Sequence, residues 1–188
     1  MRSNPSQPAA VGRAALSEAR DAIATAVGAP RRLDAPQYEA ERRANAASLS
    51  TPSQGVFVTL RDAKGDLRGC VGHVEPAHSS LLEEVRACAR AAATQDPRFS
   101  PVPADDLSGL TLEVSLLSEP ERVADPNDLD PGRFGVVVAD GRRRGVLLPN
   151  IDGVDTADQQ VAIAARKAGF TPGPTTVVHR FEVNKYSE

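Results

Sequence analysis

The stretch that is most informative about the fold of this chain is Leu67-Arg68-Gly69-Cys70-Val71-Gly72-His73, in which a cysteine lies between two glycines. The stretch follows the β-branched and aromatic run 55–60 and the turn residues 63–66, a pattern that predicts a β-hairpin ending at the cysteine. A buried structural cysteine usually lies within an apolar run, whereas flanking glycines leave the backbone near Cys70 open to the close approach of a ligand. Cys70 is therefore the first candidate functional residue.

Outward from this hairpin, the apolar periodicity predicts the other elements. Helices are expected at residues 9–27, 80–95 and 156–168, and strands at 110–117, 134–138, 145–148 and 177–183. The polar stretch 31–54 is expected to be a connector with a helical turn around 38–47. Residues 1–12 are predicted to be a flexible tail, and 13–188 a single domain. Because tight turns and helical crossings both join the strands, the class is α+β, with mixed, mostly antiparallel sheets and packed helices.

The helix at 80–95 has one apolar stripe, which decides how its cysteine is interpreted. Leu81, Val85, Cys88 and Ala92 recur at helical spacing, and Glu84 falls outside the stripe. Cys88 is therefore predicted to be a core residue.

Composition excludes several classes of protein. The chain has 188 residues, 40% apolar and 25% charged, with a formal net charge of -3. These values are typical of a soluble globular protein and argue against a broad basic surface for nucleic acid, although the local run Arg142-Arg143-Arg144 remains. The N-terminus lacks the apolar region of a secretory signal and no apolar run could span a membrane, so a cytoplasmic location is expected.

Motifs for common cofactors are not found in the sequence. We see no GxGxxG, Walker A loop, HExxH or CxxC pair, so the sequence predicts no cofactor and no metal. Two cysteines in a reducing compartment are expected to be thiols rather than a disulfide.

Seven short blocks in fixed order resemble the AMMECR domain family. They are Gly55-Val-Phe-Val-Thr-Leu60, Leu67-Arg-Gly-Cys-Val-Gly72, Asp96-Pro-Arg-Phe99, Leu112-Glu-Val-Ser115, Gly145-Val-Leu-Leu-Pro149, Arg166-Lys-Ala-Gly169 and Arg180-Phe-Glu182. The second block is the family's signature, and the resemblance extends over residues 15–183. The chain departs from the family pattern because it has no tryptophan and carries Asn150-Ile-Asp-Gly-Val-Asp155 in place of a longer acidic segment.

The resemblance implies an α+β protein of two lobes flanking a cleft that the signature loop partly lines. Bacterial and archaeal members are named protein A of the AmmeMemoRadiSam system. The name implies MEMO-type dioxygenase-fold proteins and radical S-adenosylmethionine (radical SAM) proteins as partners.

Cys70 is the predicted catalytic residue. A thiolate is the reactive form of cysteine, and the backbone N–H groups exposed by Gly69 and Gly72, together with Arg68, would stabilise it. The alternative is that the glycines serve a bulge or tight turn and Cys70 only fills a small space.

A cysteine nucleophile needs a base, and the chain has three histidines. His73 lies three residues from Cys70, so its side chain is expected on the opposite face of an extended strand unless Gly72 turns it back. His78 is in a polar loop, and His179 reads as a hydrogen-bonded core residue. Cys70, His73 and His78 have the ligand types of a metal site, but one short C-x-x-H run predicts none.

Arg68 and Arg98 are the candidate contacts for an anionic group, since arginine holds carboxylate or phosphate with two parallel hydrogen bonds. With Gly69, Gly72, His73 and Asp96 they form the predicted substrate-binding set. The alternative for the segment 96–99 is structural, with Asp96 paired locally and a buried aromatic ring.

Two functions remain open from the sequence. The first is an enzyme, or enzyme subunit, that uses Cys70 in the cleft on a small or nucleobase-like anionic substrate. The second is a non-catalytic adaptor that presents the signature loop to a protein partner.

Overall fold

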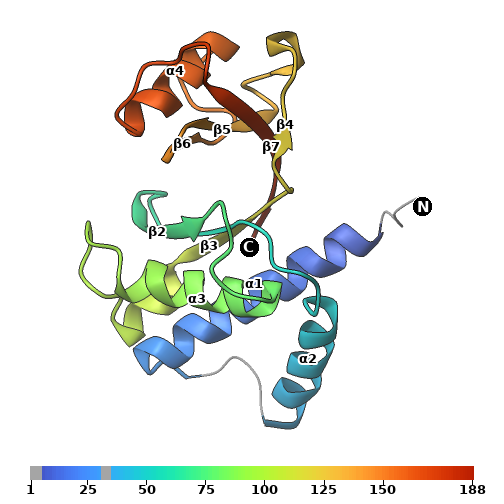
Figure 1. Ribbon diagram of the computed structural model, residues 1–188. Helices are drawn as coiled ribbons and strands as arrows, with labels where there is room; N and C mark the ends of the chain where they lie inside the picture. Colours follow the sequence, from blue (N-terminus) through green and yellow to red (C-terminus); the bar gives the residue numbers. More distant parts are fainter. Residues whose placement is uncertain (1–5, 31–34) are drawn as a thin grey trace. The chain divides into compact units, whose positions relative to one another are not determined.

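The computed structural model describes residues 6–30 and 35–188 and shows a mixed α+β protein (Figure 1). The chain divides into two compact units. Unit 1 contains the chain through Leu116 together with Lys185–Glu188, and unit 2 is Leu117–Asn184. The predicted α+β class is confirmed. Among the described residues, no helix is long and apolar enough to cross a bilayer.

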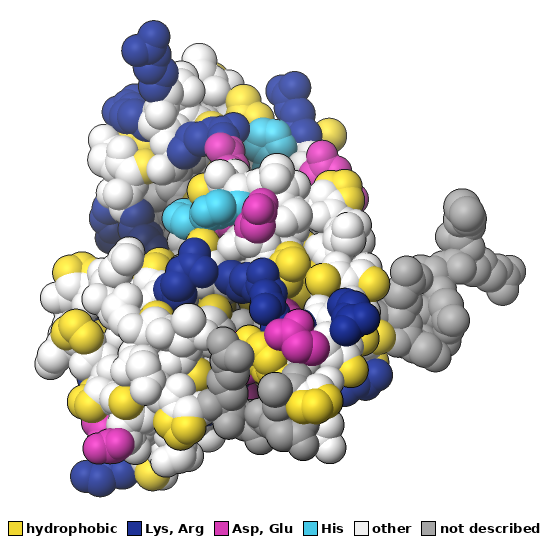
Figure 2. Space-filling view, turned by 90° about the horizontal axis from the view of Figure 1, so that it is seen from below, with side chains coloured by type: hydrophobic (Ala, Val, Ile, Leu, Met, Phe, Trp, Pro, Cys, Tyr) yellow, Lys and Arg dark blue, Asp and Glu magenta, His cyan; other side chains and the backbone are white. Residues whose placement is uncertain are grey.

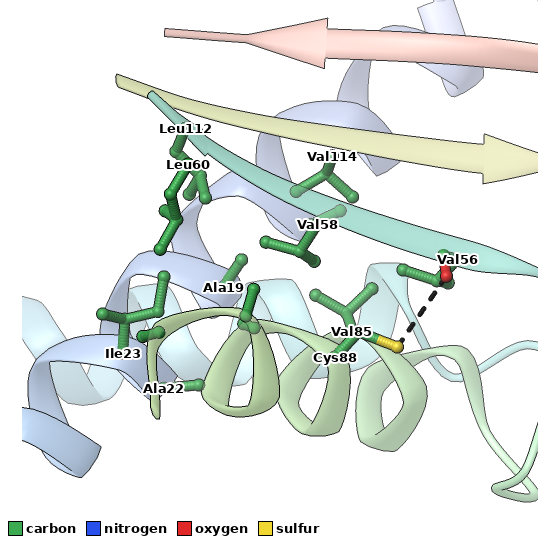
Figure 3. Packing of buried hydrophobic residues seen from close by; sticks show 14 of the residues in the cluster. Ala19, Ala22, Ile23, Val56, Val58, Leu60, Val85, Cys88, Leu112 and Val114 are labelled. Atoms are coloured by element: carbon green, nitrogen blue, oxygen red, sulfur yellow. Dashed lines mark hydrogen bonds between the residues drawn. The ribbon is translucent and has the colours of Figure 1, made fainter. Parts of the chain in front are cut away.

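Unit 1 is a small antiparallel sheet covered by helices. Its elements are α1 (Ser6–Val27), α2 (Ala35–Ser48), β1 (Val56–Arg61), β2 (Leu67–His73), α3 (Leu81–Thr94), a 3-10 helix (Ala104–Gly109) and β3 (Thr111–Leu117). The strands lie in the order β2-β1-β3. Alternate β1 residues Val56, Val58 and Leu60 are fully buried and point toward α1 and α3 (Figure 3). This period of two is what places one face of a strand in the core.

The register of β1 and β2 decides which face each signature residue occupies. Thr59 pairs with Cys70, and Val58 pairs with Val71. Residues opposite one another in an antiparallel pair share a face. Cys70 therefore lies with Thr59 on the face away from the helices, whereas Val71 and His73 lie on the helix side.

Unit 2 repeats the same plan with fewer helices. Its elements are β4 (Glu121–Arg122), a 3-10 helix (Pro126–Asp128), β5 (Phe134–Asp140), β6 (Arg143–Leu147), α4 (Ala157–Lys167) and most of β7 (Val177–Ser187). The strand order is β4-β7-β5-β6. Its core is a cluster of apolar side chains from β5, β6 and α4 and from the segment that follows α4: Val136, Val138, Leu147, Ala164, Ala165 and Phe170. α4 begins with a capping box, in which the Thr156 hydroxyl accepts from the Gln159 N–H and the Gln159 side chain accepts from the Thr156 N–H.

The structure extends the predicted elements at several places. α1 begins at Ser6, so residues 6–12 are helical rather than a tail, and residues 1–5 lie outside the described part. Its first turns contain good helix formers such as Ala9 and Ala10. The segment expected to be a connector contains the full helix α2, whose Tyr38 and Asn45 are buried. A sparse apolar stripe hid this helix, because only a few of its residues reach the core.

Candidate functional site

Cys70 lies in β2 and is partly buried. The Thr59 hydroxyl donates a hydrogen bond to Sγ at 3.4 Å. Since Cys70 and Thr59 are cross-strand partners, this contact follows directly from the register. The thiol is thus held on the face of the sheet opposite to the one that packs against α1 and α3.

Asp96 and Arg98 hold both backbone groups of Cys70. The buried Asp96 carboxylate accepts the Cys70 N–H through Oδ2 at 2.8 Å, and Arg98 Nη2 donates to the Cys70 carbonyl oxygen at 3.1 Å. The two side chains form an ion pair of 2.7 Å. Together they give this residue the hydrogen bonds that a neighbouring strand would supply. The predicted local pairing of Asp96 is confirmed, and its main partner outside the turn is the signature strand.

The same contacts set the charge of the pair. Hydrogen bonds from the Arg98 side chain lower the pKa of Asp96 strongly, and those from the backbone N–H groups of Cys70 and Arg98 add to this effect against the opposing effect of burial. Asp96 in turn raises the pKa of Arg98, and Cys70 contributes in the same direction. All acceptor positions that Asp96 uses go to Cys70 and Arg98. Asp96 is therefore suited to position its neighbours rather than to contact a ligand.

Arg68 and Arg98 share the Phe99 ring. Their guanidinium carbons lie 6.0 Å and 5.4 Å from its centroid, and Arg68 also donates to the Pro101 carbonyl oxygen at 3.3 Å. Phe99 is half-buried rather than fully buried. The structure thus brings two cations to one aromatic ring beside the signature strand.

The two signature glycines pack against the protein itself. A Cβ at Gly69 would collide with the Ala92 carbonyl oxygen of α3, and one at Gly72 would collide with the backbone and ring of Phe57. The absence of a side chain therefore lets α3 rest directly on β2. This packing agrees with the structural interpretation of the glycines, because the space beside Gly69 is already filled by the helix.

His73 does not meet Cys70. Its Nδ1 lies 2.7 Å from Glu84 Oε1 on the helix side of the sheet, as the strand parity predicted. The His78 Nδ1 is 2.9 Å from the other oxygen of Glu84, which also accepts the N–H groups of Ala77 and His78 at 2.9 Å and 2.8 Å. One carboxylate thus orients two imidazoles and the loop between β2 and α3.

Glu84 and Cys88 form the buried side of this cluster. Burial raises the pKa of the Glu84 carboxyl, but hydrogen bonds from His73, His78 and the loop backbone outweigh it, so the pKa lies below its ordinary value. Burial, followed by the Glu84 carboxylate, raises the pKa of the Cys88 thiol to about 12. Cys88 Sγ also contacts the Val56 carbonyl oxygen at 3.8 Å (Figure 3), which confirms it as a core residue.

Glu84 is the site residue that the sequence analysis missed. It was placed outside the apolar stripe, yet its side chain is 0% exposed. Its spacing of four from Cys88 indicates that it is buried, because residues four apart share a helix face and Cys88 was already assigned to the core. The combination of Cys70, His73 and His78 is not assembled, since Cys70 lies on the other face.

The other basic candidates are occupied or scattered. Arg143 is paired with Asp140 at 2.6 Å and lies over the Phe170 ring, within unit 2. On the face shown in Figure 2, Lys and Arg side chains are interspersed with acidic, polar and apolar ones and form no single continuous patch.

The comparisons with known proteins agree with this architecture. The model of the AMMECR1 family matches residues 16–187. A protein of Thermotoga maritima is 49% identical over 133 residues, covering 70% of this chain and 76% of that protein. A Clostridium acetobutylicum protein is 40% identical over 135 residues, and the match spans 72% of this chain but 28% of that protein's length. The crystal structure of an uncharacterised protein from Pyrococcus horikoshii superposes with a TM-score of 0.73 at 28% identity, covering 95% of this chain and 91% of that one. With a family match over nearly its whole length, the chain belongs to the AMMECR1 family.

Proposed function

We propose that Cys70 is the reactive thiol of a site that binds a small anionic ligand, with Arg98 as the group that orients the anion. The observation that carries this proposal is the position of the thiol. Cys70 is only partly buried, its Sγ accepts a hydrogen bond from Thr59, and the Arg98 guanidinium is held against the same residue by Asp96. Arg98 thus places a positive charge beside the residue that carries the thiol, where it favours the thiolate and an approaching anion.

Arg98 is suited to this role because part of its guanidinium remains available. Nε and Nη2 bind Asp96 and Cys70, while Nη1 has no hydrogen-bond partner among the described residues. The side chain is 54% exposed. A carboxylate or phosphate oxygen could bind Nη1 without disturbing the clamp. Arg68, held at the same aromatic ring, would add a second positive charge.

The test compares alkylation by neutral iodoacetamide with alkylation by anionic iodoacetate. We expect both reagents to modify Cys70 and to leave the fully buried Cys88 unmodified in the folded protein. Arg98→Gln should lower the ratio of the iodoacetate rate to the iodoacetamide rate several-fold. Arg90→Gln, which removes an exposed arginine of α3, is the matched control and should leave the ratio unchanged.

A Cys70 that reacts no faster than Cys88 would overturn the proposal. If Arg98→Gln left the ratio of the two alkylation rates unchanged, the claim that Arg98 orients an anionic ligand would be wrong. Mass spectrometry of the two cysteine peptides gives both rates from one sample.

A second candidate function is that of an adaptor that presents β2 to MEMO-type or radical SAM partners. It is favoured by the clamp on Cys70, which is the pair of hydrogen bonds that joins its backbone to Asp96 and Arg98. The clamp binds the backbone of Cys70 and not its thiol, so it fixes the shape of the strand for any side chain at this position. Cys70→Ser separates the two candidates. It should abolish a thiol-dependent activity but preserve the binding of a partner that reads the strand.

A further inference from the structure

A second cluster of chemistry-bearing groups lies on the helix side of unit 1, apart from Cys70. His73, Glu84 and Cys88 bring together an imidazole nitrogen, a carboxylate oxygen and a sulfur, all within 4.8 Å of one another. Two of the three residues are fully buried, and they are four residues apart on one face of α3. His73 joins them from the end of β2.

Two of the three distances between these atoms fit the edges of a tetrahedron around a zinc ion. Cys88 Sγ lies 3.7 Å from Glu84 Oε1 and 3.8 Å from His73 Nδ1. With ordinary zinc bond lengths, tetrahedral ligands that include one sulfur are separated by about 3.5 Å. The third edge, from His73 Nδ1 to Glu84 Oε1, is a hydrogen bond of 2.7 Å. It would open to about 3.3 Å once a metal replaces the shared proton.

Charge also favours a divalent cation here. A Zn²⁺ ion bound by one thiolate, one carboxylate and a neutral imidazole forms a neutral group, which a buried position tolerates far better than an isolated charge. On binding, the Cys88 thiol proton leaves for solvent and the His73 proton moves from Nδ1 to Nε2. No oxidant or further reactant is needed.

The surroundings supply a second layer of support and an open side. His78 Nδ1 lies 2.9 Å from Glu84 Oε2, the oxygen that faces away from the sulfur contact, and the loop N–H groups hold the same oxygen. Outer partners of this kind orient metal ligands. The His73 side chain is 44% exposed, so one side of the cluster is accessible to water.

From these observations we propose that His73, Glu84 and Cys88 bind one zinc ion, with His78 positioning Glu84 and water in the fourth place. Three protein ligands with one open position is the arrangement of zinc sites that bind and polarise a small molecule. This site is distinct from the thiol at Cys70, because the two lie on opposite faces of β2.

The experiment titrates the full chain, first freed of metal by a chelator, with Zn²⁺ against a competing chromogenic chelator. We expect one equivalent to bind. Cys88→Ser and His73→Gln should each weaken binding more than His78→Gln, for which the loss is about 10–100-fold. Cys70→Ser and His179→Gln are the matched controls and should bind as the unaltered protein does.

Cobalt(II) provides a readout that does not depend on how the buried Cys88 variant folds. A thiolate ligand gives an intense charge-transfer absorption with Co²⁺, and the chain has only two cysteines. The band should persist when Cys70 has been blocked by alkylation and vanish in His73→Gln. Loss of the band on blocking Cys70, or zinc binding that survives in both Cys88→Ser and His73→Gln, would overturn the proposal. So would a protein that binds less than one equivalent of either metal.

Discussion

Replacing Glu84 by glutamine removes one negative charge from the centre of unit 1 and leaves the shape of the side chain almost unchanged. The carboxylate is fully buried and accepts four N–H donors, two from histidine rings and two from the loop backbone. A glutamine has a single oxygen, so it can serve only one side of this arrangement. Its NH₂ group then points at His73 or at the loop.

The expected cost follows from the change in those hydrogen bonds. A bond to a charged group contributes about 1.5–3 kcal/mol, and a neutral one about 0.5–1.5 kcal/mol. Converting three retained bonds from charged to neutral, at about 1–1.5 kcal/mol each, therefore predicts a loss of about 3–4.5 kcal/mol in the free energy of unfolding of unit 1 at neutral pH. Glu83→Gln makes the same change at the exposed neighbouring position and should stay within about 0.5 kcal/mol.

The assay uses tyrosine fluorescence in urea, with metal removed by a chelator. The chain has no tryptophan and two tyrosines, and both Tyr38 and Tyr186 belong to unit 1. Their signal therefore reports the unfolding of this unit alone. The slope with urea should match that of the unaltered protein, so that a shift in midpoint measures stability.

The pH dependence gives a second check with a definite sign. The pKa of Glu84 is lowered by folding, so its contribution is fully present above its unfolded value of about 4.3 and is lost as the pH falls through the folded value. The difference between Glu84→Gln and the unaltered protein should shrink across that acidic range. The assignment of Glu84 as an ionised hydrogen-bond acceptor would be refuted if this difference in the free energy of unfolding were under about 0.5 kcal/mol at about pH 7, or if it did not depend on pH.

Three further substitutions test other contacts. Gly69→Ala pushes a methyl group into the α3 backbone at Ala92 and should cost unit 1 about 1–3 kcal/mol by tyrosine fluorescence, whereas Gly109→Ala meets open space and should not destabilise. Asp96→Asn should lower the free energy of unfolding by about 1–3 kcal/mol at neutral pH. The loss should become smaller as acid protonates the native carboxyl, because folding lowers the pKa of Asp96. Urea unfolding at several pH values measures this loss, and a loss that does not change with pH would contradict the prediction. Thr156→Ala removes the cap of α4 and should cost about 1 kcal/mol by circular dichroism, with the tyrosine transition unmoved.

The hairpin that carries Cys70 could be predicted from sequence because its signal is local. Alternation in β1 and the turn before β2 predict the two strands, and the spacing of three along β2 places Cys70 and His73 on opposite faces. The apolar stripe of α3 likewise predicted the burial of Cys88. These inferences required only neighbours a few residues apart.

The rest of the site depends on contacts that no local pattern encodes. Asp96 binds the Cys70 N–H across 26 residues of sequence, and the backbone N–H groups that bind the buried Glu84 carboxylate come from the loop before α3. A glutamate in the first turn of a helix ordinarily faces solvent and favours the helix N-terminus. This tendency favours an exposed Glu84, the spacing of four from Cys88 favours a buried one, and the contacts with the loop decide between the two.

The division of β7 between the two units has a consequence for the order of folding. Unit 2 is one continuous segment, inserted into unit 1 between Leu116 and Lys185. Unit 1 also contains residues 185–188, where Glu188 binds Arg20 across a sequence separation of 168 and its N–H donates to the Leu112 carbonyl oxygen. Contacts of such long range form slowly, because the chain must close a large loop before they stabilise anything. During synthesis unit 2 can thus fold as soon as it leaves the ribosome, while unit 1, which carries both candidate sites, acquires its final strand last.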